Sequence, residues 1–158
     1  MRKITKESSE AFVNFKSYKK DNTEVSVRFD SVSKECIPSK YMVSSFYLHG
    51  NLIARLRDGV NPSVKIDLCG YHTRITRERI NGILDALGYD FRIAQRNHEQ
   101  VLVRNRRWKF HENGGWEESY SEDILKLSTD SFDPEFAEKV FLSSEFIKGT
   151  DLNAIADF

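Results

Sequence analysis

Apolar and polar residues alternate along several short stretches in the first two thirds of the chain. In residues 52–57 (LIARLR), every second position is apolar and the two arginines lie between. A period of two places one row of side chains in a core and the other in water, which is typical of a β-strand with one wet face. Residues 41–48 are rich in aromatic and β-branched residues, which strands favour. The predicted strands are residues 24–29, 41–48, 52–57, 64–69, 91–96 and 101–110.

Short turn sequences separate most of these strands. Residues 49–51 (HGN) offer Gly and Asn, which tolerate the positive φ angles of tight hairpins. Residues 58–63 (DGVNPS) and 97–100 (NHEQ) also favour turns. These turns predict an antiparallel meander, whereas the polar residues 30–40 are expected to form a longer connection.

A helical period replaces the alternation over residues 76–87. Its apolar residues recur at the spacing of one helix face: Ile80, Ile83, Leu84 and Leu87. Thr76 is the expected N-cap, and Gly88 is expected in the left-handed conformation that ends many helices. Gly82 lies mid-helix, where glycine is less favourable than alanine by up to about 1 kcal/mol. Close packing against another backbone would explain it.

A second helix is predicted over residues 134–148. Asp133 is a suitable N-cap, Pro134 follows at the first helical position, and Gly149 can end the helix. Residues 1–14 are expected to form either a polar helix or a loose arm. Together these elements predict one α+β domain over residues 1–158, in which an antiparallel sheet of about five to six strands packs on one central helix, with a C-terminal helix.

The composition agrees with a soluble globular protein, since 39% of the 158 residues are hydrophobic and 30% are charged. No apolar run approaches the roughly 20 residues that span a bilayer, so no membrane partner is predicted. The N-terminus lacks the apolar region of a signal peptide, and two cysteines are too few for a disulfide framework. A cytoplasmic location is therefore expected.

The net charge of zero conceals a segregation of charge along the chain. Residues 1–116 hold 21 Lys and Arg against 13 Asp and Glu, whereas residues 117–158 hold 3 against 11. This pattern predicts a basic α+β core followed by an acidic, helical C-terminal segment. The acidic segment either packs on the basic core or presents a negative surface to a basic partner. The acidic candidates for partner binding are Glu117, Glu118, Glu122 and Asp123.

Basic residues gather on the hairpin predicted for residues 91–110. Cationic side chains interleaved with aromatic ones suit a phosphate backbone and stacked bases. The pI near 6.9 is lower than that of a dedicated nucleic-acid domain, and these arginines are alternatively the wet face of ordinary strands. The candidates for binding nucleic acid or a partner are Arg92, Arg96, Arg104, Arg106, Arg107, Trp108 and Lys109 on the hairpin, and Arg74, Arg77 and Arg79 at the start of helix 76–87.

Cys69 and His72 offer a thiolate and an imidazole at C-x2-H spacing, a pattern found at metal and catalytic sites. A structural zinc site needs four ligands, and the other histidines are scattered singly. As a nucleophile and base, the pair lacks an evident orienting acid. No Gly-rich phosphate loop and no hydrolase motif occurs. The sequence therefore predicts no catalytic residue, metal or cofactor, and an enzyme using Cys69 and His72 is the third choice of function.

Four short motifs carry a resemblance to a known group of proteins. They read NTEV at 22–25, YLHGNLIA at 47–54, CGYHT at 69–73 and TRERIN at 76–81. In this order they resemble small uncharacterised tailed-phage proteins with the patterns NT-V, YLHGN-IA, CG(W/Y)-T and TR-RLN. The resemblance implies a phage-encoded accessory protein made inside a bacterial cell, and it implies no particular activity.

The leading prediction is a non-enzymatic binding protein that engages and modulates a host macromolecule. The favoured target is a host defence or nucleic-acid-processing protein, contacted through the charge-segregated surface. Direct binding of nucleic acid through the hairpin 92–109 is the alternative.

Overall fold

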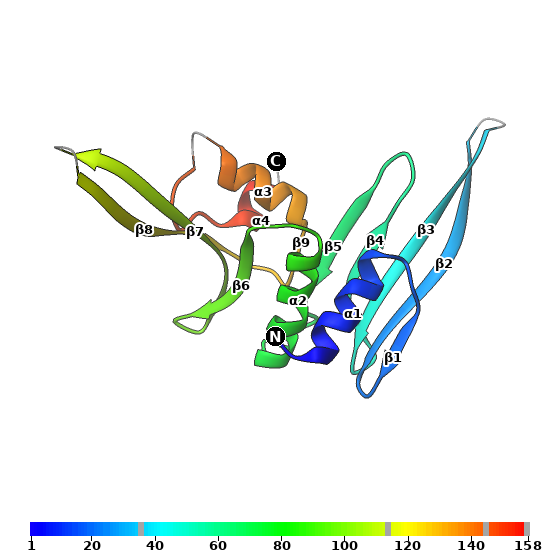
Figure 1. The fold of residues 1–158 in the computed structure, drawn as a ribbon. Helices are drawn as coiled ribbons and strands as arrows, with labels where there is room; N and C mark the ends of the chain where they lie inside the picture. Colours follow the sequence, from blue (N-terminus) through cyan, green and yellow to red (C-terminus); the bar gives the residue numbers. More distant parts are fainter. Residues whose placement is uncertain (35–36, 113–114, 144–145, 157–158) are drawn as a thin grey trace.

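The computed structural model describes the backbone of residues 1–34, 37–112, 115–143 and 146–156, with their side chains except those of 31–34, 37–39, 106–112, 115–120 and 155–156. These residues form two antiparallel sheets and four helices (Figure 1). Sheet A contains, in spatial order, β1 (Tyr18–Lys20), β2 (Thr23–Lys34), β3 (Ile37–Leu48), β4 (Asn51–Arg57), β5 (Ser63–Asp67) and β9 (Ser131–Phe132). Sheet B contains β6 (Phe91–Arg96), β7 (Glu99–Glu112) and β8 (Gly115–Lys126). The helices are α1 (Lys3–Val13), α2 (Arg74–Ala86), α3 (Pro134–Leu142) and α4 (Leu152–Ala156).

The predicted α+β class is confirmed, but the predicted strands 91–96 and 101–110 do not join the first sheet. They pair with each other and with β8 to form sheet B. At the free edge of β6, the side chain of Asn81 in α2 makes the two hydrogen bonds that a further strand would make. Its Nδ2 donates to the carbonyl oxygen of Ile93 at 3.0 Å, and its Oδ1 accepts from the N–H of Ile93 at 2.7 Å. Because a helix covers this edge, no strand of sheet A pairs with it.

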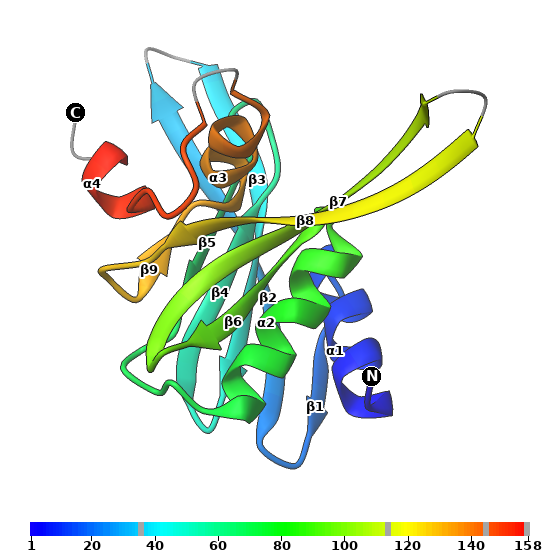
Figure 2. The same ribbon diagram turned by 90° about the vertical axis from the view of Figure 1, so that its left-hand side faces the viewer.

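One hydrophobic core lies between the two sheets. Figure 2 shows α1, α2 and sheet B on the same side of sheet A. Phe12 of α1 meets Phe46 of β3 edge to face, with ring centroids 5.9 Å apart. The same core includes Ile66 of sheet A, Ile83 of α2 and Leu102 of sheet B. Within the described residues, no helix has the length and apolar content needed to cross a bilayer.

The α2 helix begins one turn earlier than predicted. The N-cap is Thr73, whose Oγ1 accepts from the N–H of Thr76 at 3.2 Å, so the prediction of Thr76 as N-cap is wrong. The predicted end is confirmed, since Gly88 has a φ of +86° and the N–H of Tyr89 donates to the carbonyl oxygen of Leu84.

Gly82 lies where α2 crosses α1. A Cβ at this position would stand 2.5 Å from Cγ2 of Thr5 and 2.6 Å from Oγ of Ser9. The absence of a side chain therefore lets the two helices approach closely, which explains a glycine in the middle of a helix.

The β2–β3 hairpin is longer than predicted. Residues 30–40 were expected to form a connection, but the strands pair from Asp30 opposite Tyr41 to Lys34 opposite Ile37. The prediction is wrong because hydrogen bonds between paired strands outweigh the weak strand preference of a serine-rich stretch. At the N-terminus, the helical alternative holds, since α1 begins at Lys3.

The C-terminal segment is less helical than predicted. Residues 115–126 form β8, which pairs along its length with β7, so the first part of the predicted helical segment 117–158 is a strand, and its helices α3 and α4 follow later. Asp133 caps α3 as predicted. The helix then ends at Leu142 rather than 148, because Ser143 is extended, with a ψ of 138°. Ile147, which lies beyond the end of α3, is 71% exposed.

Candidate anion-binding groove

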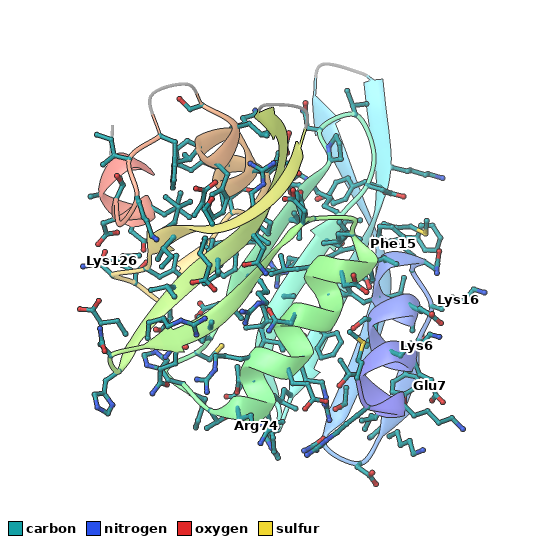
Figure 3. All side chains as sticks on the ribbon, turned by 60° about the vertical axis from the view of Figure 1, so that its left-hand side comes forward. Lys6, Glu7, Phe15, Lys16, Arg74 and Lys126 are labelled. Carbon is teal, nitrogen blue, oxygen red and sulfur yellow. The ribbon has the colours of Figure 1, made fainter. Side chains whose placement is uncertain are left out.

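A groove of about 570 Å³ lies between the start of α1, the first turns of α2 and strand β6. Four arginines line it: Arg2, Arg74, Arg77 and Arg92. Among the described residues that line this groove, Glu78 is the single carboxylate. Figure 3 labels Arg74 at the beginning of α2. A concave surface with four guanidinium groups and one carboxylate attracts an anionic partner.

The hydrogen bonds between Asn81 and Ile93 fix the distance between the two walls of the groove. Asn81 lies one turn after Arg77 on α2, and Ile93 follows Arg92 on β6. Any movement of β6 away from α2 would break both bonds, so the arginines on the two walls keep their spacing.

Arg77 is held in place by its neighbours. Its Nη1 donates to the carbonyl oxygen of His72 at 2.9 Å and to Oε1 of Gln95 at 3.1 Å. Gln100 is buried and donates from Nε2 to the same oxygen of Gln95. This network orients the guanidinium of Arg77 before any ligand arrives.

Arg74 and Arg92 are exposed, and neither side chain forms an ion pair or hydrogen bond within the described part of the chain. Arg2 lies 3.6 Å from Oε2 of Glu78, and its side chain is 62% exposed. Arg74, Arg77 and Arg92 therefore have no carboxylate partner among the described residues, although Arg77 is hydrogen-bonded to neutral groups.

Arg79, a predicted binding residue, is 2% exposed and does not reach this surface. Its guanidinium donates to the hydroxyl oxygens of Thr5 and Thr23 and lies 3.3 Å from Oε1 of Glu78. Burial lowers the pKa of Arg79, and the nearby Glu78 carboxylate opposes that shift. Arg79 therefore joins α1, α2 and β2 and has no free surface for a ligand.

The remaining basic residues of the predicted hairpin do not share one environment. Arg104 donates from Nε to Oδ2 of Asp90 at 2.9 Å, and Arg96 lies 3.7 Å from Glu122. The backbone of β7 places Arg106, Arg107, Trp108 and Lys109 opposite Ser121, Tyr120, Ser119 and Glu118, and these four side chains lie outside the described ones.

The acidic candidates lie beside the basic ones, because β8 pairs with β7. Asp123 is opposite Arg104 and is buried, and Glu122 is half-buried. Glu117 and Glu118 follow on the same strand, and their side chains lie outside the described ones. Charges that are segregated in the sequence are therefore adjacent in the fold.

Comparison with known proteins identifies the family. The sequence model described as Kyanoviridae Gp96 protein matches residues 1–124. The chain belongs to this tailed-phage family. No curated protein and no solved structure matches the chain.

The match to the Gp96 family confirms the predicted phage origin. The matched residues include the four arginines of the groove and the helices and strands that position them, whereas α3 and α4 lie outside the match. Of the four groove arginines, the sequence did not single out Arg2. Nothing in the sequence signals that the start of α1 lies beside α2 and β6, because that contact depends on how the helices pack.

Cys69 and His72 do not hydrogen-bond to each other in the described part of this Gp96-family protein. The thiol of Cys69 donates to the carbonyl oxygen of Leu52 at 3.1 Å, and burial, with Asp67 and Asp130 nearby, raises its pKa. His72 instead pairs with Asp130, with Nε2 and Oδ1 2.6 Å apart. Asp130 is an acid that orients the His72 ring, and the sequence did not reveal it. The raised pKa keeps the Cys69 thiol in the protonated, less nucleophilic form.

Proposed function

We propose that this phage protein is a non-enzymatic binding protein that engages a host macromolecule through the groove and modulates its activity. The favoured target is a host defence or nucleic-acid-processing protein that presents a segment rich in Asp and Glu. The proposal rests on three arginines that line the same groove. Arg74 and Arg92 are exposed and unpaired among the described residues, and the guanidinium of Arg77 is held in a fixed orientation by its hydrogen bonds.

Arginine suits this role because its planar guanidinium pairs with a carboxylate through two parallel hydrogen bonds. The two walls are already held together by Asn81 and Ile93, so little ordering is needed when the partner binds. Charge complementarity of this kind mainly accelerates association and selects the partner.

The proposal is tested by capture of partners from a lysate of the host bacterium. The wild-type protein is expected to recover one stoichiometric host protein, and the Arg74→Glu/Arg92→Glu variant is expected to lose it. Lys16→Glu/Lys148→Glu is the matched control, because it changes the charge by the same amount on exposed positions outside the groove and outside sheet A. No stoichiometric partner, or equal recovery by the groove variant, would contradict the proposal.

Direct binding of nucleic acid is the second candidate function. The position of Arg92 beside Arg74 and Arg77 favours it, since a phosphate backbone suits the same groove. The pairing of Arg104 with Asp90 counts against the hairpin 92–109 as one continuous positive surface. In a DNA or RNA shift assay, loss of binding by both Arg92→Glu and an Arg104→Ala/Arg106→Ala/Arg107→Ala variant would favour this second function.

A further inference from the structure

In the part of the chain that the structure describes, one face of sheet A is covered by no other element. The core residues Phe46 and Ile66 point toward the helices, so their strand neighbours Ser45 and Lys65 point to the opposite side. Within the described residues, the helices and sheet B all lie on the core side (Figures 1 and 2). We call the uncovered side the open face of sheet A. Its described cations and aromatic residues on β3, β4 and β5 are Tyr41, Tyr47, Arg55, Arg57 and Lys65, with Arg28 of β2 beside them.

Two like charges face each other at the centre of the open face. Arg55 of β4 is directly opposite Lys65 of β5, both are exposed, and neither side chain has a hydrogen bond or ion pair among the described residues. Like charges directly opposite in a sheet are destabilising. A pair of this kind is compatible with a site that receives an anion, because a bound phosphate removes the repulsion.

The remaining cations and carboxylates of this face are arranged around that pair. Arg57 lies two residues from Arg55, donates to the carbonyl oxygen of Asn61 and stacks over Tyr41 with its Cζ 5.4 Å from the ring centroid. Arg28 is paired with Asp30 at 3.0 Å. The other carboxylates of these strands lie nearer the 49–51 turn: Glu24 is opposite Tyr47, and Asp67 follows Lys65 by two residues. The positive charge is therefore concentrated at the centre of the face.

Two tyrosines mark the ends of the basic region on β3. Tyr41 and Tyr47 are half-buried, and the two residues between them on the same face, Val43 and Ser45, are buried. Val43 is flanked by Arg28 and Arg57 on the neighbouring strands, and Ser45 is flanked by Arg55 on β4. The face is thus a shallow surface with aromatic rings at two points and cations beside them. A sheet of this kind suits unstacked bases and a phosphate backbone, whereas a duplex is read by an element that enters its grooves.

We propose that the open face of sheet A binds single-stranded nucleic acid, with Arg55, Lys65 and Arg57 on phosphates and Tyr47 stacked on a base. This surface is separate from the groove that engages the host protein. One chain therefore has room for a nucleic-acid strand and a host protein at the same time.

The test is fluorescence anisotropy with labelled oligothymidine and oligouridine of about 20 nucleotides, and with a duplex of the same length, across a salt series. The wild-type protein is expected to bind one or both single strands more tightly than the duplex. The single strand with the higher affinity shows whether the natural ligand is DNA or RNA. Arg55→Ala/Lys65→Ala is expected to reduce the slope of log K against log salt by about 1.4, since each lost contact to a single strand contributes about 0.7. Tyr47→Leu is expected to weaken binding by about fivefold or more with an unchanged slope.

The matched control is Lys16→Ala/Lys148→Ala, which removes the same charge from exposed positions outside sheet A and the groove and is expected to leave strand binding unchanged. Arg74→Glu/Arg92→Glu tests the groove as the competing site for the strand. Thermal unfolding of each variant verifies that the fold is retained. Three results would overturn the inference: no binding by the wild type at low salt, an unchanged slope in Arg55→Ala/Lys65→Ala, or loss of binding in the groove variant alone. Because Arg55→Ala/Lys65→Ala and the groove variant alter different surfaces, this inference and the proposed host-protein contact fail independently.

Discussion

The side chain of Asn81 bonds both main-chain polar atoms of Ile93, at 2.7 and 3.0 Å, and so holds strand β6 against helix α2. This contact closes the free edge of sheet B and sets the width of the groove. Arg77 and Arg92 lie on its two walls, and their separation depends on it.

Asn81→Ala is expected to lower the free energy of unfolding by about 2 kcal/mol, because the polar atoms of Ile93 on the edge facing α2 lose their partner. Urea denaturation measures this change. Asn81→Asp keeps the acceptor and loses the donor, so a smaller loss is expected. Equal stability of Asn81→Ala and the wild type would show that water replaces both bonds without loss.

Gly82→Ala is expected to destabilise the protein, although alanine is the better helix former by about 1 kcal/mol. The new Cβ would overlap Thr5 and Ser9 of α1, and overpacking of this kind typically costs about 1–3 kcal/mol. Urea denaturation shows whether the free energy of unfolding rises or falls. In a Thr5→Ser/Ser9→Ala background, where the nearest atoms are removed, Gly82→Ala is expected to be less harmful. A stabilising Gly82→Ala in the wild-type background would contradict close packing of the two helices.

Lys65→Glu is expected to stabilise the fold by about 0.5 kcal/mol, because it turns a like-charged pair with Arg55 into an opposite-charged one. The same variant is expected to bind single-stranded nucleic acid more weakly. Thermal unfolding and anisotropy measure the two effects. Lys148→Glu, at an exposed position after α3, is the control for a general effect of charge. A variant that loses both stability and binding would indicate that Lys65 supports the sheet itself.

Cys69 is expected to react slowly with iodoacetamide near pH 7, because burial raises the pKa of its thiol and leaves less thiolate than in a free cysteine. The rate of alkylation is measured in a Cys36→Ser variant, so that Cys69 is the cysteine that reacts. A rate equal to that of free cysteine would restore the enzyme hypothesis.

The same shift makes a prediction for stability. A thiol whose pKa is raised by folding contributes stability that is present below the ordinary thiol pKa of 9.0 and is lost as the pH rises through the folded value. The stability of Cys69→Ala is therefore expected to fall less steeply above pH 9 than that of the wild type. Parallel curves for the two proteins would contradict the raised pKa.

The sequence predicts the elements that have local signals. The apolar stripe of α2 and the left-handed Gly88 depend on neighbours within a few residues, and both are found. The hairpin turn at His49 and Gly50 is found for the same reason, with φ values of 50° and 79°. The pairing of β7 with β8 was missed, because residues 115–126 are polar and acidic and have little strand preference of their own.

The candidate site was only partly predictable. Arg74, Arg77 and Arg92 were singled out for their charge, but their convergence with Arg2 depends on tertiary packing. Arg79 has the same residue type and lies two positions from Arg77, yet it is buried at a helix junction. Charged residues are seldom buried, so sequence alone assigns Arg79 to the surface.

The central claim is that a host protein occupies the groove, and the most direct measurement is site-specific photocrosslinking in infected host cells. A photoreactive amino acid at Arg92 is expected to capture one host protein, whereas the same group at Lys139 on α3 is expected not to capture it. Capture of no host protein at Arg92, or of the same proteins from both positions, would contradict the claim.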